Sequence, residues 1–229
     1  MGGILFDRFF LLRIPVIIFL TFAYFYYVPK FSQLVYYPIL LGYAAYFSYL
    51  FFVFSPKLKV SNFLVSKFGE EKAFLIHQLF LSLLFANLAL SITSLSIMEK
   101  TGINAAYFLP KLLEWETIII KLQIAVAYAV IIIGKGIKVA AAFQLGSDGY
   151  YWKDLFLRKR TIEFQRAGIY KYFNHPMYGI GNISIYGISL LYGSLSILIM
   201  GVIYQLILFA FLHFIEKPHM KEIYGIQSA

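Results

Sequence analysis

The stretch MYGIGNISIYGISLLYGSLSILIMGVIYQLILFAFLHFI, from Met177 to Ile215, decides the fold. It holds about forty largely apolar residues, twice the roughly 20 residues that one membrane-crossing helix requires. Gly193 and Ser194 lie near its middle and mark a turn. The sequence therefore predicts two antiparallel helices, over residues 178–192 and 195–215. We expect Pro218 to end the second helix, with too few residues after it for another element.

The composition places this hairpin in a membrane protein. The chain has 229 residues, of which 61% are hydrophobic and only 14% are charged. With this composition, a soluble domain of 229 residues would have too few polar side chains to cover its surface. The chain has no cysteine, which excludes disulfides, thiolate zinc sites and cysteine nucleophiles. We expect one integral membrane domain over residues 1–229.

Four further apolar runs precede the hairpin, each long enough to cross a bilayer. They cover residues 9–28, 34–54, 73–98 and 117–142. The fold class predicted is therefore all-α, a polytopic helical bundle of about six spans that ends in a short helical hairpin. Residues 1–116 contribute three N-terminal spans, and residues 117–229 form the core that carries the motifs described below.

The positive charges predict how this bundle is oriented. With six spans, both termini and the loops 55–72 and 143–177 share one face of the membrane. That face holds Arg8, Lys57, Lys59, Lys67, Lys72, Lys153, Arg158, Lys159, Arg160, Arg166, Lys171, Lys217 and Lys221, against Lys30, Lys100, Lys111 and Lys121 on the other. The bias predicts cytoplasmic termini. It also explains the net charge of +9 without nucleic-acid binding, which we do not expect.

A polar and aromatic segment, Gly168-Ile169-Tyr170-Lys171-Tyr172-Phe173-Asn174-His175-Pro176-Met177-Tyr178-Gly179, comes just before the hairpin. Pro176 biases His175 toward an extended backbone and is well suited to the first turn of a helix. Free amides at that helix start would form an anion-binding site. This segment is where the sequence predicts the chemistry.

Glu216 stands at the end of the last apolar run, three residues after His213. A glutamate at that level is costly unless it meets a cation or water, so it is either a boundary residue or part of a site. His213, Glu216 and His219 do not have the spacing of a zinc protease helix, because Pro218 intervenes. We expect no metal, and the chain has no Gly-x-Ser-x-Gly motif of a serine hydrolase.

Gly134 and Gly136 interrupt the aliphatic run of residues 117–142, together with Lys135 and Lys138. One interpretation is close helix packing by the glycines, with both lysines extending to the headgroups. The other is a small-residue notch that lets a ligand lie against the helix backbone. The spacing alone leaves both interpretations open.

Three motifs in order carry a resemblance to a known family. Asn174-His175-Pro176-Met177-Tyr178-Gly179, followed by Phe214-Ile215-Glu216-Lys217-Pro218-His219-Met220 and Tyr224-Gly225, resembles the C-terminal signature of the membrane-embedded phospholipid methyltransferase and isoprenylcysteine carboxyl methyltransferase superfamily. Gly134-x-Gly136 and Phe143-Gln144-Leu145-Gly146-Ser147-Asp148-Gly149-Tyr150 are similar to motifs of phosphatidylethanolamine N-methyltransferases. The resemblance covers residues 130–225 or so and is closest to the phospholipid enzymes.

The resemblance implies a helical bundle that binds S-adenosylmethionine at the cytoplasmic face of a bacterial or archaeal membrane, or of the endoplasmic reticulum. It also implies methyl transfer to the amine headgroup of a membrane phospholipid. The residues that it places around the cofactor are Gly134, Gly136, Asn174, His175, Pro176, Tyr178, Gly179 and Glu216. The sequence departs from the family pattern at two positions. Lys217 stands where the family often has a second acid, and Asn174 stands where the carboxyl methyltransferases have an arginine.

A protonated lipid amine must lose a proton before it accepts a methyl group, so a proton acceptor is needed. The candidate catalytic residues are His175, Glu216 and Tyr178, with Asp148 as a further candidate acceptor. One alternative is carboxyl methylation of a prenylcysteine, or methylation of another lipid. A second is a membrane sterol or enone reductase that uses NADPH. A third is a helical membrane protein that keeps the pocket without catalysis.

Overall fold

The computed structural model describes residues 36–55, 58–98, 116–163 and 165–225, and every regular element in these ranges is helical. The all-α prediction is confirmed for this part of the chain. The first expected span, residues 9–28, and most of the loop before residue 116 lie outside the described residues.

The helices follow the predicted apolar runs closely. They are α2 (Tyr36–Phe54), α3 (Val60–Phe68), α4 (Glu70–Met98), α5 (Glu116–Tyr150), α6 (Lys153–Leu157), α7 (Ser184–Tyr192), α8 (Leu195–Phe211) and α9 (Lys217–Tyr224), with the 3₁₀ turns η4 (Gly168–Lys171) and η5 (Ile180–Ile183) and the π-helical turn η6 (Leu212–Glu216). The short helix α3 lies in a segment that the sequence predicted as a loop.

Within the described ranges, three helical segments are long and apolar enough to cross a membrane: Glu70–Leu90, Ile118–Leu157 and Leu195–Tyr224. Two shorter apolar helices cover Leu41–Phe54 and Ile180–Tyr192. This supports an integral membrane protein. The count of six spans and the cytoplasmic termini remain predictions.

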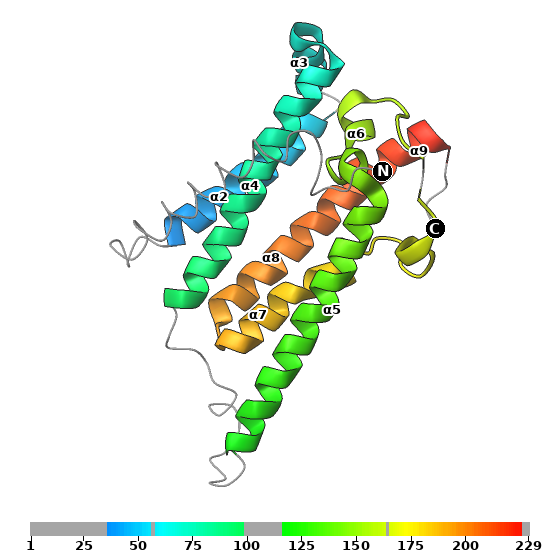
Figure 1. The fold of residues 1–229 in the computed structure, drawn as a ribbon. Coiled ribbons are helices and arrows are strands. Elements are labelled where there is room, and N and C mark those ends of the chain that lie inside the picture. Colours follow the sequence, from blue (N-terminus) through cyan, green and yellow to red (C-terminus); the bar gives the residue numbers. More distant parts are fainter. Residues whose placement is uncertain (1–35, 56–57, 99–115, 164, 226–229) are drawn as a thin grey trace.

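The bundle has two halves that face each other (Figure 1). On one side, α2 and α4 pack together; on the other, the α7–α8 hairpin packs along the long helix α5. The small helices α3, α6 and α9 gather at one end. A core of aromatic and aliphatic side chains from α2, α4, α6 and α8 joins the halves, and it includes Tyr46, Leu50, Phe156 and Phe211.

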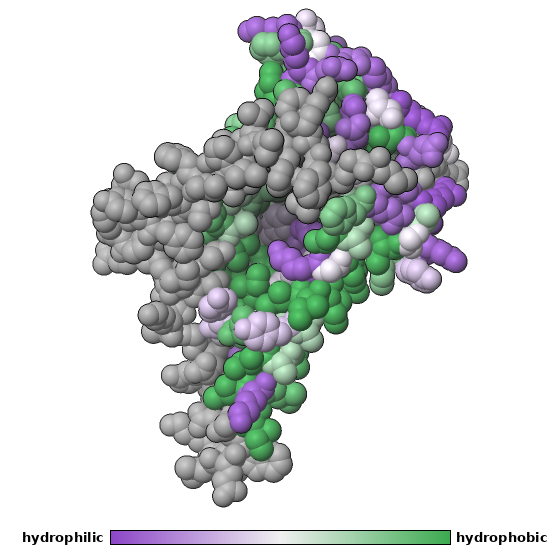
Figure 2. All heavy atoms as spheres, viewed as in Figure 1, coloured by the Kyte–Doolittle hydropathy of each residue, from purple (hydrophilic) through white to green (hydrophobic). Residues whose placement is uncertain are grey.

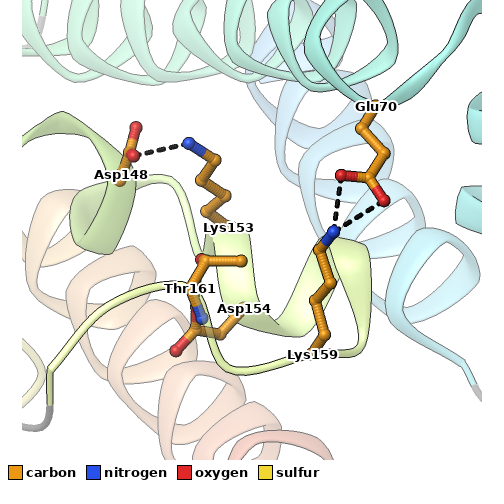
Figure 3. A network of polar contacts seen from close by, with 6 residues as sticks. All are labelled: Glu70, Asp148, Lys153, Asp154, Lys159 and Thr161. Carbon is orange, nitrogen blue, oxygen red and sulfur yellow. Dashed lines mark hydrogen bonds and ion pairs between the residues drawn. The ribbon is translucent and has the colours of Figure 1, made fainter.

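Figure 2 shows that hydrophilic residues gather at the end of the molecule where α3 and α6 lie, while the body beneath is largely hydrophobic. Two ion pairs cross this end, as Figure 3 shows. Lys159 Nζ lies 2.6 Å from a carboxylate oxygen of Glu70, and Lys153 Nζ lies 2.6 Å from one of Asp148. Such an end is suited to the membrane–water boundary.

The chain kinks at Gly146, near the start of the segment that the sequence predicted as the loop 143–177. Gly146 has φ 69° and ψ 178°, a conformation that residues with a side chain rarely adopt, and it interrupts the helix within α5. Helical geometry then resumes up to Tyr150, so the helix runs further than the predicted end at residue 142.

The prediction that the last helix ends at Pro218 is wrong. The chain continues directly from η6 into α9, where Pro218 lies in the first turn. A proline is tolerated there because the first amides of a helix need no intrahelical acceptor. Glu216 therefore sits at a junction between two helices and not at a free end.

Candidate active site

Three polar side chains from distant parts of the chain form a hydrogen-bonded row. Trp152 Nε1 donates to Tyr178 Oη at 2.8 Å, and Tyr178 Oη donates to Glu216 Oε2 at 2.5 Å. Trp152 lies between α5 and α6, Tyr178 lies in the turn before η5, and Glu216 ends η6. The structure thus brings together Tyr178 and Glu216, two residues that the motifs had assigned to one site.

The π-helical turn η6 decides where Glu216 points. The amide of Lys217 donates to the carbonyl of Leu212, one residue further back than in an α-helix. A π turn inserts a residue and so re-aims the side chains that follow it, and such turns are frequent at functional sites. Glu216 is half-buried as a result, while the neighbouring Phe214 is exposed.

Tyr178 is held by a second set of contacts on its backbone. Gln205 Nε2, from α8, donates to the Tyr178 carbonyl, and Asn182 Nδ2 donates to Gln205 Oε1 at 2.9 Å. Burial, together with the carboxylate of Glu216, raises the pKa of Tyr178 well above its usual value. The phenol therefore keeps its proton at neutral pH and donates it in the bond to Glu216.

His175 lies beside this row. Its ring is nearly parallel to that of Tyr178, with centroids 6.4 Å apart, and its side chain is half-buried. Burial lowers the pKa of His175 below its ordinary value, and the charge of Lys217 lowers it further. The imidazole is therefore neutral at pH 7 and able to accept a proton.

The helix start expected at Pro176 is absent, and so are its free amides. The segment forms a tight turn in which the His175 carbonyl accepts from the amides of Tyr178 at 3.2 Å and Gly179 at 2.9 Å. Regular helix begins only at Ile180. The prediction of an anion site at this point is wrong, because those two amides already have an acceptor. Asn174 is exposed to one side of the turn.

Gly134 and Gly136 differ sharply in their surroundings. A Cβ on Gly134 would stand 2.6 Å from the backbone nitrogen of Ser184, so this glycine permits the close approach of α5 to α7. A Cβ on Gly136 would meet nothing within 4 Å. Close helix packing thus explains Gly134, while Gly136 leaves the backbone of α5 open.

We therefore expect opposite effects on stability from Gly134→Ala and Gly136→Ala. The first forces apart a backbone contact and should destabilise by about 1–3 kcal/mol. The second removes a flexible residue from an exposed helical position and should be neutral or stabilise by about 0.5–1 kcal/mol. Thermal unfolding of both variants in detergent checks this, and equal shifts in Tm would contradict the assigned packing.

A cavity of about 380 Å³ opens between the two halves of the bundle. Its wall includes Trp152 and Tyr178, two members of the hydrogen-bonded row, and Glu216 lies behind Tyr178. The other aromatic residues lining it are Tyr43, Tyr46, Phe85, Phe143, Tyr150 and Tyr204. Phe143 and Tyr150 belong to a motif that the sequence had singled out. Sequence reasoning missed the other four, since Tyr43, Tyr46 and Tyr204 lie within apolar runs and their spacing gives no signal of a shared pocket.

The two C-terminal histidines do not join the row. His213 is exposed, and the His219 ring places Nε2 at 3.1 Å from the Asp154 carbonyl. Among the described residues, no group of three or more histidine, aspartate and glutamate side chains is placed to hold a metal ion.

The lowered pKa of His175 predicts a pH dependence of stability. The folded pKa lies below the unfolded value of about 6.5, so stability is complete above that pH and falls as the pH drops below it. We expect the Tm of the wild type to decrease more between pH 7 and pH 5 than that of His175→Gln. Equal decreases in the two proteins would contradict a neutral, half-buried His175.

Comparison with known proteins gives a consistent result for the part of the chain that carries this site. Residues 122–227 match the sequence model of the family described as phospholipid methyltransferase. All of α6 to α9, the cavity wall on α5, and the Trp152–Tyr178–Glu216 row lie within these residues.

Curated relatives agree with this match. The phosphatidylethanolamine N-methyltransferase of Schizosaccharomyces japonicus is 35% identical over 109 residues, which cover 47% of this chain and 12% of that protein. The proteins of the same name from Scheffersomyces stipitis and Clavispora lusitaniae are 31% and 30% identical, over 47% and 58% of this chain and 13% and 16% of their own length. The chain thus spans a small fraction of these relatives. No solved structure matches it significantly.

Proposed function

We propose that this protein methylates the amine headgroup of a membrane phospholipid, because residues 122–227 match the sequence model of the phospholipid methyltransferase family. The methyl donor is S-adenosylmethionine, and the acceptor is phosphatidylethanolamine or one of its methylated forms. The site faces the cytoplasmic side of the membrane, as the distribution of lysine and arginine predicts.

The observation that carries this proposal is the state of Glu216. Its carboxylate is half-buried, it accepts a hydrogen bond from Tyr178, and it forms no ion pair with any described residue. A carboxylate away from bulk water is stable beside a cation. Both proposed ligands supply a cation. The methyl donor carries a sulfonium and an ammonium group, and the lipid headgroup carries a protonated amine.

The residues present fit the donor in their chemistry. Glu216 would bind its positive groups, while Tyr178 and the half-buried His175 would line its pocket. When bound, S-adenosylmethionine supplies an electrophilic methyl group on a sulfonium. The aromatic cavity excludes water and orients the acceptor, which is what a displacement with dispersing charge requires of a protein.

The chain also offers acceptors for the proton that the lipid amine must lose. His175 is neutral, and the Glu216 carboxylate is one hydrogen bond from the cavity wall through Tyr178. Tyr178 stays protonated and orients Glu216 through the hydrogen bond between them. Lys217, at the position of the family's second acid, lies near enough to His175 to lower its pKa.

The acceptor class is tested by offering two acceptors at once. The full chain, purified and reconstituted in liposomes, receives donor with a labelled methyl group, phosphatidylethanolamine and a farnesylcysteine. The proposal predicts label in the phospholipid as a stable N-methyl group. Label released from farnesylcysteine by mild base would identify a carboxyl methyl ester and overturn the choice of acceptor.

The donor is tested separately by isothermal titration with S-adenosylmethionine and with NADPH. We expect heat of binding with the first alone. Binding of NADPH instead would move the protein to the reductase class, whereas binding of neither would favour a helical protein without catalysis.

A further inference from the structure

The cavity contains two positive charges that the row of Trp152, Tyr178 and Glu216 leaves unexplained. Lys135 and Lys138, three residues apart on α5, both line it. No aspartate or glutamate is among the lining residues, and neither lysine forms an ion pair with any part of the chain that the structure describes. A half-buried positive charge in a largely aromatic cavity, close to a second like charge, is costly unless an anion joins it.

Lys138 is fixed at a crossing of α5 with η5. Its Cα and Cβ would stand 3.3 and 3.2 Å from a Cβ on Gly181, so this lysine packs directly against that turn. Its Nζ lies 6.0 Å from the centre of the Tyr204 ring, and its side chain is half-buried. Lys135, by contrast, is exposed. The ammonium of Lys138 therefore stands inside the bundle and not at its surface.

The remaining walls of the cavity divide into a polar and an apolar part. Trp152 and Tyr178 lead to Glu216. Aliphatic side chains from α4, α7 and α8 form an apolar part of the wall, including Leu88, Ile92, Ile185, Ile188 and Leu208. The cavity thus offers Lys138 to an anion and an aliphatic surface to hydrocarbon, and its wall at Tyr178 leads by one hydrogen bond to Glu216, which could meet a cation.

We propose that Lys138 binds the phosphodiester of the acceptor phospholipid and so sets the position of its amine. This rests on the proposed function and names a residue that recognises the substrate. In a zwitterionic headgroup the amine and the phosphate are joined by a short ethylene link, so one cavity can hold both. The phosphate lies at Lys138, the amine points to Tyr178 and Glu216, and the acyl chains follow the aliphatic wall. In a low-dielectric cavity, such an ion pair selects strongly for the charged ligand.

The carboxylate of the methyl donor is the other anion that could meet Lys138, so the test must separate the two. Binding to the full-length protein in detergent is measured by isothermal titration with a short-chain phosphatidylethanolamine, with an alkyl ethanolamine ether that lacks phosphate, and with S-adenosylmethionine. The variant is Lys138→Gln, which keeps a polar side chain but removes the positive charge. The matched control is Lys121→Gln, an exposed lysine on the same helix that does not line the cavity.

We expect Lys138→Gln to weaken phosphatidylethanolamine binding at least tenfold while leaving the phosphate-free ether and the donor unchanged. Lys121→Gln should change none of the three. Unchanged phosphatidylethanolamine binding in Lys138→Gln overturns the inference, as does equal weakening of both lipids, which would indicate a purely structural role. Selective weakening of the donor would assign Lys138 to the donor carboxylate.

The same proteins distinguish this inference from the proposed function. Phosphate-dependent lipid binding that is lost in Lys138→Gln supports the role of the lysine even if the wild type transfers no methyl group. Methyl transfer to phosphatidylethanolamine that persists in Lys138→Gln with an unchanged KM supports the function and contradicts the role of the lysine.

Discussion

Replacing Glu216 with Gln is expected to lower the rate of methyl transfer at least about a hundredfold, the usual range for a group that handles charge or a proton in the reaction. The glutamine carbonyl can still accept the hydrogen bond from Tyr178, so the fold around the row should persist. What is lost is the negative charge that would meet a cation, and with it a proton acceptor. Initial rates at saturating donor and lipid measure the effect, with the Tm recorded to confirm folding.

The matched control for this variant is Glu222→Gln. Glu222 lies on α9, is exposed, and has no place in the row. We expect its rate to stay within about twofold of the wild type, since exposed charges of this kind have small effects. If Glu216→Gln retained half of the wild-type rate, Glu216 would be a boundary residue and the candidate site would be wrong.

Asp154→Ala is expected to cause the largest loss of stability. Asp154 is buried, and its carboxylate accepts from the amide of Thr161 at 2.8 Å, from the Thr161 hydroxyl and from the Tyr224 hydroxyl. These bonds tie α6 to the following loop and to α9, directly beyond Glu216 (Figure 3 shows the Thr161 side). Removing the acceptor breaks three hydrogen bonds to a buried carboxylate, each contributing about 0.5–1.5 kcal/mol, so we expect a loss above about 2 kcal/mol.

Asp148→Ala provides the comparison. Asp148 pairs with Lys153 at the same end of the bundle, but 41% of its side-chain surface is exposed. An exposed pair contributes about 0–1 kcal/mol, so its loss should barely move the unfolding transition. Chemical or thermal unfolding in one detergent compares the two variants. Similar shifts would show that Asp154 does not hold α9 in place.

Sequence periodicity and length predicted most of the helices, because membrane spans are defined by long apolar runs that need no tertiary information. The pair of Tyr178 and Glu216 was also predictable, since both lie in short motifs that resemble one family. The difference between Gly134 and Gly136 could not be predicted from the sequence, because it depends on which face of α5 meets α7. That face is set by tertiary packing, and two glycines on one helix look alike in sequence.

Three other features depended on contacts between distant segments. The π turn at η6 has no local signature, yet it directs Glu216 toward Tyr178. The role of Asp154 requires Thr161 and Tyr224 to meet it, and the cavity requires tyrosines from α2 and α8. Lys138 appeared in the sequence as a lysine that extends to the headgroups, and only the crossing with η5 places it inside the bundle.

In the proposed function, Glu216 and the aromatic wall beside it hold the methyl donor. A structure of the full chain with S-adenosylhomocysteine, the demethylated donor, tests it most directly. We predict the amino group of the ligand within hydrogen-bonding distance of the Glu216 carboxylate, and its sulfur facing the cavity bounded by Tyr178 and Trp152. Ligand density that leaves Glu216 and His175 without contact would contradict the account.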